Sequence, residues 1–577
     1  MQIRRTCSKL IAGAIILSGL TAPVFSQTAA TSTKDTGNRS DVSLLKQEIA
    51  EQQQQIEQLR KIVEEMKQRQ DQSTAPAQTA AVNAPNLGQV ASATPMVPKG
   101  DSKAVTASSA ADLHSMAASA AAPSLNASAS ARALNGQATE ETPKSSPLSF
   151  RIGDSEFTPG GFMDFTEFFR STDLGSGIGT SFGSLPFSVT GGTVNPAARL
   201  SESRFSNQNS RLSMKVTSQV GENKVTGYVE ADFLGNAANS IFQTSNSDTL
   251  RMRLYWVDLL RGKWEVLGGQ SWSMMTPGRD GISANPSNIF YSQDMDTNYQ
   301  VGLTWARQPQ FRIVYHPNKE WAIGLSLENS EQFLTTAVAL PGGSSGTYAS
   351  QFDIGGNQIS TPNLMPDIAA KVAYDPTIGG KHLHAELGGV LRAFRDYAST
   401  TNTKNSNEGG ALEGGLNLEA VKDLHFIVNG FYGAGGGRYI YGLGPDVVVK
   451  PDGSIATVRS GSGIAGFEFQ VNKKTMLYAY YGGAYFDNAY YVSSVSGAGV
   501  PTYVGFGYPG SSNTSNRVLQ EGTVGFVQTF WKNPKYGALQ WINQVSYVER
   551  APWYIPSGTS KNAHLDMVYT DLRYVLP

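Results

Sequence analysis

Residues 211–233 read Arg-Leu-Ser-Met-Lys-Val-Thr-Ser-Gln-Val-Gly-Glu-Asn-Lys-Val-Thr-Gly-Tyr-Val-Glu-Ala-Asp-Phe. Apolar and polar side chains alternate along both arms of this stretch, and Gly221-Glu222-Asn223 stands between the arms. Successive side chains of a β-strand point to opposite faces, so the alternation predicts two strands, each with one apolar and one polar face. The glycine-containing segment between them predicts a tight turn.

The same pattern continues through residues 149–577, where short and long connections alternate. The short ones are Gly221–Asn223, Arg261–Lys263, His316–Lys319, Pro376–Gly380, Val421–Asp423, Asn472–Lys474 and Asn533–Lys535. The long ones fall near 172–207, 235–247, 272–297, 330–365, 397–408, 435–461, 488–516 and 551–561. Outer-membrane barrels have short periplasmic turns, long outer loops and an even number of strands. We therefore expect an all-β transmembrane barrel of about 16 antiparallel strands, wide enough for an aqueous channel.

Two segments refine this count. We interpret Asn298–Tyr315 as one strand with a bulge or kink at Pro309, because two strands there would spoil the alternation of the loops. Met567–Pro577 is expected to be the closing strand.

Aromatic residues at strand ends are expected to form girdles at the membrane surfaces; they are Trp321, Tyr478, Tyr480, Trp541 and Trp553.

The N-terminus has the features of an export signal. Residues 1–26 carry Arg4 and Arg5, a short apolar run, and small residues before Gln27, which predicts a cleaved signal peptide. The only cysteine, Cys7, lies within it, so the mature chain is expected to contain no disulfide, cysteine nucleophile or cysteine metal site. The formal net charge of −1 does not indicate a nucleic-acid partner.

Residues 41–70 carry a heptad repeat, which predicts an oligomeric coiled coil. Its seam consists of Val42, Leu45, Ile49, Gln52, Ile56, Leu59, Val63 and Met66. β-Branched residues at the a positions with leucine at d favour a dimer. Residues 71–148 are rich in Ala, Ser, Thr, Pro and Gln, and we interpret them as a disordered linker.

Basic residues on the polar face would line the pore if the apolar face meets lipid. They are Arg211, Lys215, Arg251, Arg253, Arg312, Lys371 and Arg392. One interpretation is that they attract and bind small anionic solutes. The other is that they pair with wall acids such as Glu230, Asp232 and Glu386 and hold the wall together.

The third long loop, 272–297, contains Arg279, Asp280, Asp294 and Asp296. We expect it to fold inward as a constriction loop, where its acids would face a basic wall and set a transverse field. The alternative is a plain loop on the outer surface.

The sequence offers little that indicates an enzyme. His382 and His384 would share a face of one strand, but no third ligand stands near them in the sequence. We therefore expect no metal, no cofactor and no catalytic site. A barrel hydrolase that depends on His382 or His564 is kept as a minor alternative.

Several stretches resemble the DcaP-like outer-membrane porin family. They are Phe157–Phe165, Gly268–Ser273, Tyr480–Phe486 and Leu572–Pro577. The resemblance implies a homotrimer in the Gram-negative outer membrane that passes small anionic solutes, dicarboxylates among them. Two other functions stay open: a structural protein that tethers the envelope to the cell wall through the coiled coil, and a general or sugar porin.

Overall fold

The computed structural model describes residues 57, 146–235, 248–343, 347–356, 361–399 and 401–577. All of them except Glu57 belong to the unit that spans residues 104–577. The predicted signal peptide, the predicted coiled coil apart from Glu57, and almost all of the predicted linker lie outside the described residues.

The main sheet contains 19 strands, of which β1, β5 and β15 are short additions, so sixteen of the described strands form the wall. The wall strands are β2 (Ser155–Arg170), β6 (Arg211–Val220), β7 (Asn223–Gly235), β8 (Thr249–Arg261), β9 (Trp264–Trp272), β10 (Arg307–Tyr315), β11 (Trp321–Glu328), β14 (Asp367–Tyr374), β16 (Lys381–Ala398), β17 (Thr403–Val421), β18 (Leu424–Ala434), β21 (Arg459–Asn472), β22 (Thr475–Phe486), β25 (Asn516–Asn533), β26 (Gly537–Pro552) and β27 (Ala563–Val575). The added strands are β1 (Phe150–Ile152), β5 (Glu202–Ser206) and β15 (Thr377–Ile378).

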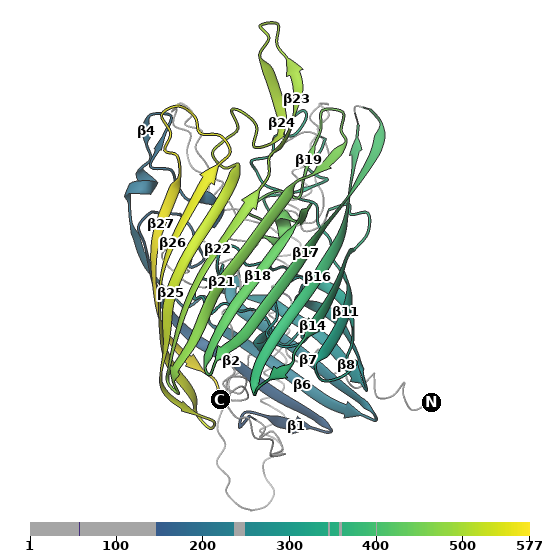
Figure 1. The fold of residues 1–577 in the computed structure, drawn as a ribbon, viewed down its shortest axis with the longest axis vertical. Helices are drawn as coiled ribbons and strands as arrows, with labels where there is room; N and C mark the ends of the chain where they lie inside the picture. The colour runs from purple at the N-terminus through teal and green to yellow at the C-terminus, as the bar shows by residue number, and fades with distance from the viewer. Residues whose placement is uncertain (1–56, 58–145, 236–247, 344–346, 357–360, 400) are drawn as a thin grey trace, which may run out of the picture. The chain divides into compact units, whose positions relative to one another are not determined.

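Each wall strand pairs antiparallel with its neighbours, and β27 pairs with β2 from Phe162↔Val575 to Arg170↔Met567. This last pairing closes the barrel and confirms the predicted strand count and closing strand (Figure 1). The predicted short turns are also confirmed, because each lies where one wall strand ends and the next begins.

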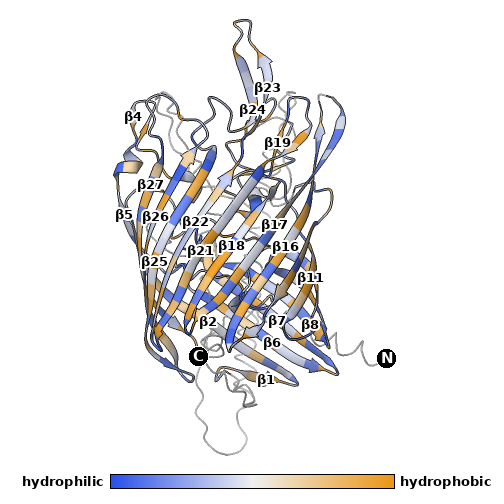
Figure 2. Ribbon diagram, viewed as in Figure 1, coloured by the Kyte–Doolittle hydropathy of each residue, from blue (hydrophilic) through white to orange (hydrophobic). Residues whose placement is uncertain are grey.

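Burial along the wall is the reverse of that in a soluble protein. On β11 the side chains of Ile323, Leu325 and Leu327 are 45%, 51% and 44% exposed, whereas Ser326 and Glu328 are 1% and 0% exposed. Apolar residues thus point out of the barrel and polar ones into it, as a lipid-facing wall requires. Figure 2 shows the resulting mixture of hydrophobic and hydrophilic residues along single strands. Among the described residues, none of the helices has the length and apolar character needed to cross a membrane.

The loops carry the remaining elements. They are β3 (Val189–Thr190), β4 (Thr193–Val194), β12 (Phe333–Leu334), β13 (Asp353–Ile354), β19 (Val447–Val449), β20 (Ile455–Thr457), β23 (Ala489–Val495), β24 (Pro501–Phe506) and the 3₁₀ turns η2 (Phe182–Ser184), η3 (Pro196–Arg199), η4 (Pro286–Asn288) and η5 (Gly437–Tyr439). The hairpin of β23 and β24 projects beyond the rim, at the end of the barrel opposite β1 (Figure 1).

The predicted strand Asn298–Tyr315 is wrong in its first half. β10 begins only at Arg307, and the connection before it runs from residue 273 to residue 306. The predicted bulge at Pro309 is also wrong, because the register with β9 runs through Pro309 without a shift. The ladder with β11 starts one residue later, at Gln310, and beyond it the carbonyl oxygen of Pro309 accepts a hydrogen bond from the backbone N–H of Asn329 at 2.9 Å.

Two smaller expectations are corrected as well. The connection predicted at 397–408 is short, because β16 continues to Ala398 and β17 begins at Thr403. Tyr478 and Tyr480 do not belong to a surface girdle, since they are 2% and 3% exposed and point into the barrel. Their hydroxyls bond to inward acceptors, Gln544 and Glu468, which explains why aromatic residues are tolerated on the polar face.

Candidate functional site

The connection between β9 and β10, residues 273–306, lies inside the barrel, and we call it the inward loop. Its backbone N–H groups donate to inward side chains of five separate wall strands. The pairs are Met274 to Glu328 (2.9 Å), Gly278 to Glu386 (2.9 Å), Gln293 to Tyr480 (2.9 Å), Met295 to Gln544 (2.8 Å) and Val301 to Glu521 (2.8 Å). A buried loop must satisfy its backbone polar groups, and here the wall does so.

The inward loop also touches the wall through glycines. Gly302 has φ +100°, and a Cβ there would lie 2.2 Å from the carbonyl oxygen of Gly463 on β21. A Cβ on Gly482 of β22 would lie 2.0 Å from the carbonyl oxygen of Val301. Only glycine allows the two backbones to approach so closely, and these contacts fix the depth of the loop.

The four predicted loop residues lie in different surroundings. Arg279 is paired with Glu468 of β21 at 2.7 Å, and Asp280 is exposed. Asp294 and Asp296 are both 0% exposed, and Asp296 accepts bonds from the backbone N–H groups of Thr180 and Asn298. Burial, and then the nearby carboxylate of Asp296, raises the pKa of Asp294 to about 8. This shift favours the protonated form of Asp294.

Four inward guanidinium groups meet on the wall beside the inward loop, and we call them the arginine cluster. They are Arg211, Arg251, Arg253 and Arg307. Two carboxylates lie among them. Arg253 binds Glu230 and Asp232 at 2.7 Å each, Arg251 binds Asp232 at 2.6 Å, and Arg211 lies 3.7 Å from Glu230. In the part of the chain that the structure describes, four cations against two anions give this part of the wall a positive excess.

Arg307 is the member of this cluster that sequence reasoning missed. Among the described residues no carboxylate forms an ion pair with it, and its Nη1 atom is buried without a hydrogen-bond partner. Its guanidinium lies 5.5 Å from the ring centroid of Trp272, over whose ring Arg253 also lies, at 5.8 Å. Arg307 is an odd number of residues from Arg312, so strict alternation places the two side chains on opposite faces, and the sequence pattern does not predict that Arg307 points inward.

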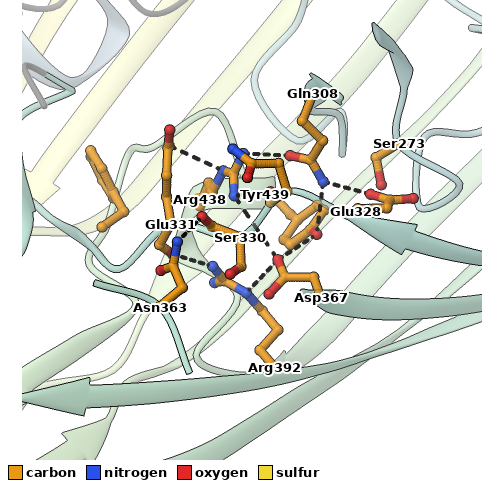
Figure 3. A network of polar contacts seen from close by, with 12 residues as sticks. Ser273, Gln308, Glu328, Ser330, Glu331, Asn363, Asp367, Arg392, Arg438 and Tyr439 are labelled. Atoms are coloured by element: carbon orange, nitrogen blue, oxygen red, sulfur yellow. Dashed lines mark hydrogen bonds and ion pairs between the residues drawn. The ribbon is translucent and has the colours of Figure 1, made fainter. Parts of the chain in front are cut away.

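Arg392 is held in a different network, which Figure 3 shows from close by. It binds Asp367 at 3.0 Å and Asp446 at 2.8 Å, and Arg438 lies 3.6 Å from Glu331 and 4.0 Å from Asp367. Here three carboxylates face two guanidinium groups, so no positive excess remains.

The other predicted basic residues are dispersed. Lys371 lies between Glu386 at 3.0 Å and Glu413 at 3.4 Å. Arg312 donates to the carbonyl oxygen of Trp272 and to the side chain of Gln310, at 2.7 Å and 2.8 Å. Lys215 is exposed.

The seven residues predicted to line the pore therefore divide into groups. Five of them form ion pairs with wall acids: Arg211, Arg251, Arg253, Lys371 and Arg392. The wall network held as the second interpretation exists, and Glu230, Asp232 and Glu386 all take part in it. Among these groups of described residues, the arginine cluster combines ion pairing with an excess of positive charge.

Comparison with solved structures gives matches to outer-membrane proteins. The outer membrane channel DcaP of Acinetobacter baumannii matches with a TM-score of 0.52 and 16% identity, over 74% of this chain and 100% of that one. An anion-selective porin from Comamonas acidovorans matches with a TM-score of 0.40 and 12% identity, over 73% and 100% of the two chains, which is too low to carry an argument. No family model matches the chain, and no curated protein does. The chain has the fold of the outer membrane channel DcaP, and this fold supports the resemblance to the DcaP-like porins found in the sequence.

Proposed function

We propose that this chain is an outer-membrane porin through which small anionic solutes, carboxylates among them, diffuse passively. The arginine cluster is the observation that carries this proposal. Among the described residues, four guanidinium groups share two carboxylates beside the inward loop, so positive charge exceeds negative charge there and would attract a passing anion. The fold shared with an outer membrane channel supports the porin part and a location in a Gram-negative outer membrane.

The approach from the short-turn end supports the same charge preference. Lys215 is an even number of residues from Arg211 on β6, so it shares the inward face of that strand. Lys224 is likewise an even number of residues from Asp232 on β7 and also faces inward. Both lysine side chains are exposed. Exposed lysines attract anions toward the pore, and the guanidinium groups then bind carboxylates with two parallel hydrogen bonds.

Reversal potentials in planar bilayers test this proposal. A single purified channel separates two concentrations of potassium chloride, and the sign of the zero-current potential gives the preferred ion. We expect chloride to be preferred. A clear preference for potassium contradicts the anion part and leaves the general porin as the better description.

A second function is favoured by the packing of the interior. Every residue from Ile289 to Ala306 is buried, as are most inward side chains of the strands around them. A barrel whose interior is filled by a loop and by inward side chains suits a structural outer-membrane protein. Such a protein would be tethered through the predicted coiled coil of residues 41–70. That function predicts no conductance in bilayers and a weakened attachment of the envelope after deletion of residues 27–148.

The assembly belongs to the same proposal. We infer a homotrimer from the family resemblance, joined in part by the predicted coiled coil, and export by a cleaved signal of residues 1–26. Mass measurement of the detergent-solubilised protein, with and without residues 41–70, tests the trimer against the dimer that the heptad pattern favours.

A further inference from the structure

Three potential metal ligands meet at the short-turn end of the barrel. His382 is the second residue of β16, Asp375 follows the end of β14, and Asp280 belongs to the inward loop. One ligand atom of each residue lies within 4.8 Å of those of the other two. The sequence concealed this group, because Asp375 and Asp280 come from other segments than the histidine strand.

The carboxylate of Asp375 is already held in a fixed orientation. One of its oxygens accepts a hydrogen bond from Nδ1 of His384 at 2.6 Å, and the other accepts one from the backbone N–H of Gly281 at 3.0 Å. Its side chain is 7% exposed, and His384 is itself fixed by Glu386 at 3.3 Å. Metal-binding carboxylates are commonly oriented by such outer partners.

The exposed side of the group is open to a dissolved ion. Asp280 is exposed, and the side chain of His382 is 34% exposed, with its Nε2 atom 3.8 Å from Asp375. Two carboxylates held this close repel each other, and a divalent cation between them would remove the repulsion. Of the cationic groups on the neighbouring elements, Lys371 is engaged with Glu386 and Arg279 with Glu468. His384 contacts Asp375 itself, at 2.6 Å.

We propose that Asp280, Asp375 and His382 bind a divalent transition-metal ion, with zinc as the best fit. One imidazole nitrogen and two carboxylate oxygens form a donor set that suits zinc, and the remaining position would hold water. His382 belongs to β16, Asp375 to the short turn after β14 and Asp280 to the inward loop, so the ion would fasten the loop to the short-turn end. This site is independent of the arginine cluster and of the selectivity proposed from it.

Calorimetric titration of the folded full-length protein in detergent with zinc chloride tests the site. We expect saturable binding that weakens at least about tenfold in Asp280→Asn and in His382→Ala, since loss of even an outer partner commonly costs that much. The matched controls are His564→Ala and Asp154→Asn, which remove an exposed histidine and an exposed carboxylate elsewhere. Both controls should bind zinc as the unaltered protein does.

Two results would overturn the proposed zinc site. It is overturned if the unaltered protein shows no saturable zinc binding, or if Asp280→Asn binds zinc as tightly as the controls do. Asp280→Asn is the decisive variant, because an exposed loop side chain can be changed without loss of the barrel. Its folding is checked by the resistance of the barrel to detergent unfolding at room temperature.

Discussion

The guanidinium of Arg279 on the inward loop lies 2.7 Å from the carboxylate of Glu468 on the inner face of β21. The same guanidinium donates to the carbonyl oxygens of Phe290 and Tyr291, in the returning limb of the loop. One side chain therefore joins the two limbs of the loop to each other and to the wall.

Removal of this contact should loosen the inward loop. In Glu468→Gln the ion pair with Arg279 is lost, and the charged guanidinium keeps only a hydrogen bond to a neutral amide oxygen. A hydrogen bond to a charged group stabilises by about 1.5–3 kcal/mol. We expect larger and noisier single-channel currents in planar bilayers. Arg261→Ala is the control, since its pair with Glu222 is exposed and should contribute little. Currents that stay steady in Glu468→Gln would show that the loop is held by its other contacts.

The glycine contact gives a steric prediction for the same loop. The Cβ of Gly482→Ala would lie 2.0 Å from the carbonyl oxygen of Val301, so the loop must move away from β22. We expect a change in single-channel conductance in this variant. Gly430→Ala on β18 is the matched control, because its Cβ would have no neighbour nearer than 4.0 Å. An unchanged conductance in Gly482→Ala would place the loop outside the path of the ions.

Arg307 should contribute to selectivity more than its neighbours do. Removal of one charge about 4 Å from a passing anion costs about 1 kcal/mol in water, which is a factor of roughly five in a permeability ratio. We expect Arg307→Gln to lower the anion-to-cation permeability ratio by about that factor, measured as a shift in reversal potential. Arg204→Gln, which removes an exposed arginine paired with Glu202 on β5, should leave the ratio unchanged.

The barrel could be predicted because its signal is local. Alternation with a period of two needs only the strand itself, and turns such as the one at Gly221 mark where strands end. The same locality explains the error at residues 298–306. Tyr299, Val301, Leu303 and Trp305 alternate with polar residues as a lipid-facing strand would, but here both faces are buried inside the barrel. Alternation cannot distinguish lipid from a packed interior.

The charge pairing could not be predicted because it depends on the register between strands. Arg253 reaches both Glu230 and Asp232, and the register of β7 and β8 shifts between Glu230 and Ala231. A sequence shows neither the shift nor the loop that buries these groups. Seven basic residues were therefore identified from the sequence, whereas Arg307 and the counter-ions of Arg392 were not.

Arg392 should matter for stability and not for selectivity. Arg392→Ala leaves the buried carboxylates of Asp367 and Asp446 without their main partner. Breaking a buried pair in this way typically costs about 3–5 kcal/mol. We expect unfolding at a lower denaturant concentration and an unchanged reversal potential for the molecules that stay folded. An effect on the reversal potential as large as that of Arg307→Gln would show that ions also contact Arg392.

Asp294 should make stability depend on pH. Its pKa is raised to about 8 from an ordinary value of 3.8, first by burial and then by Asp296. The folded protein therefore keeps the carboxyl protonated while the unfolded chain ionises it above about pH 4. The stability that this group contributes is fully present below about pH 4 and is lost as the pH rises toward 8.

Asp294→Asn cannot ionise, so it should gain stability relative to the unaltered protein over this interval. Denaturant midpoints of both proteins across the pH range measure the difference, with Asp154→Asn as the exposed control. Parallel profiles for Asp294→Asn and the unaltered protein would mean that the buried carboxyl is charged and paired.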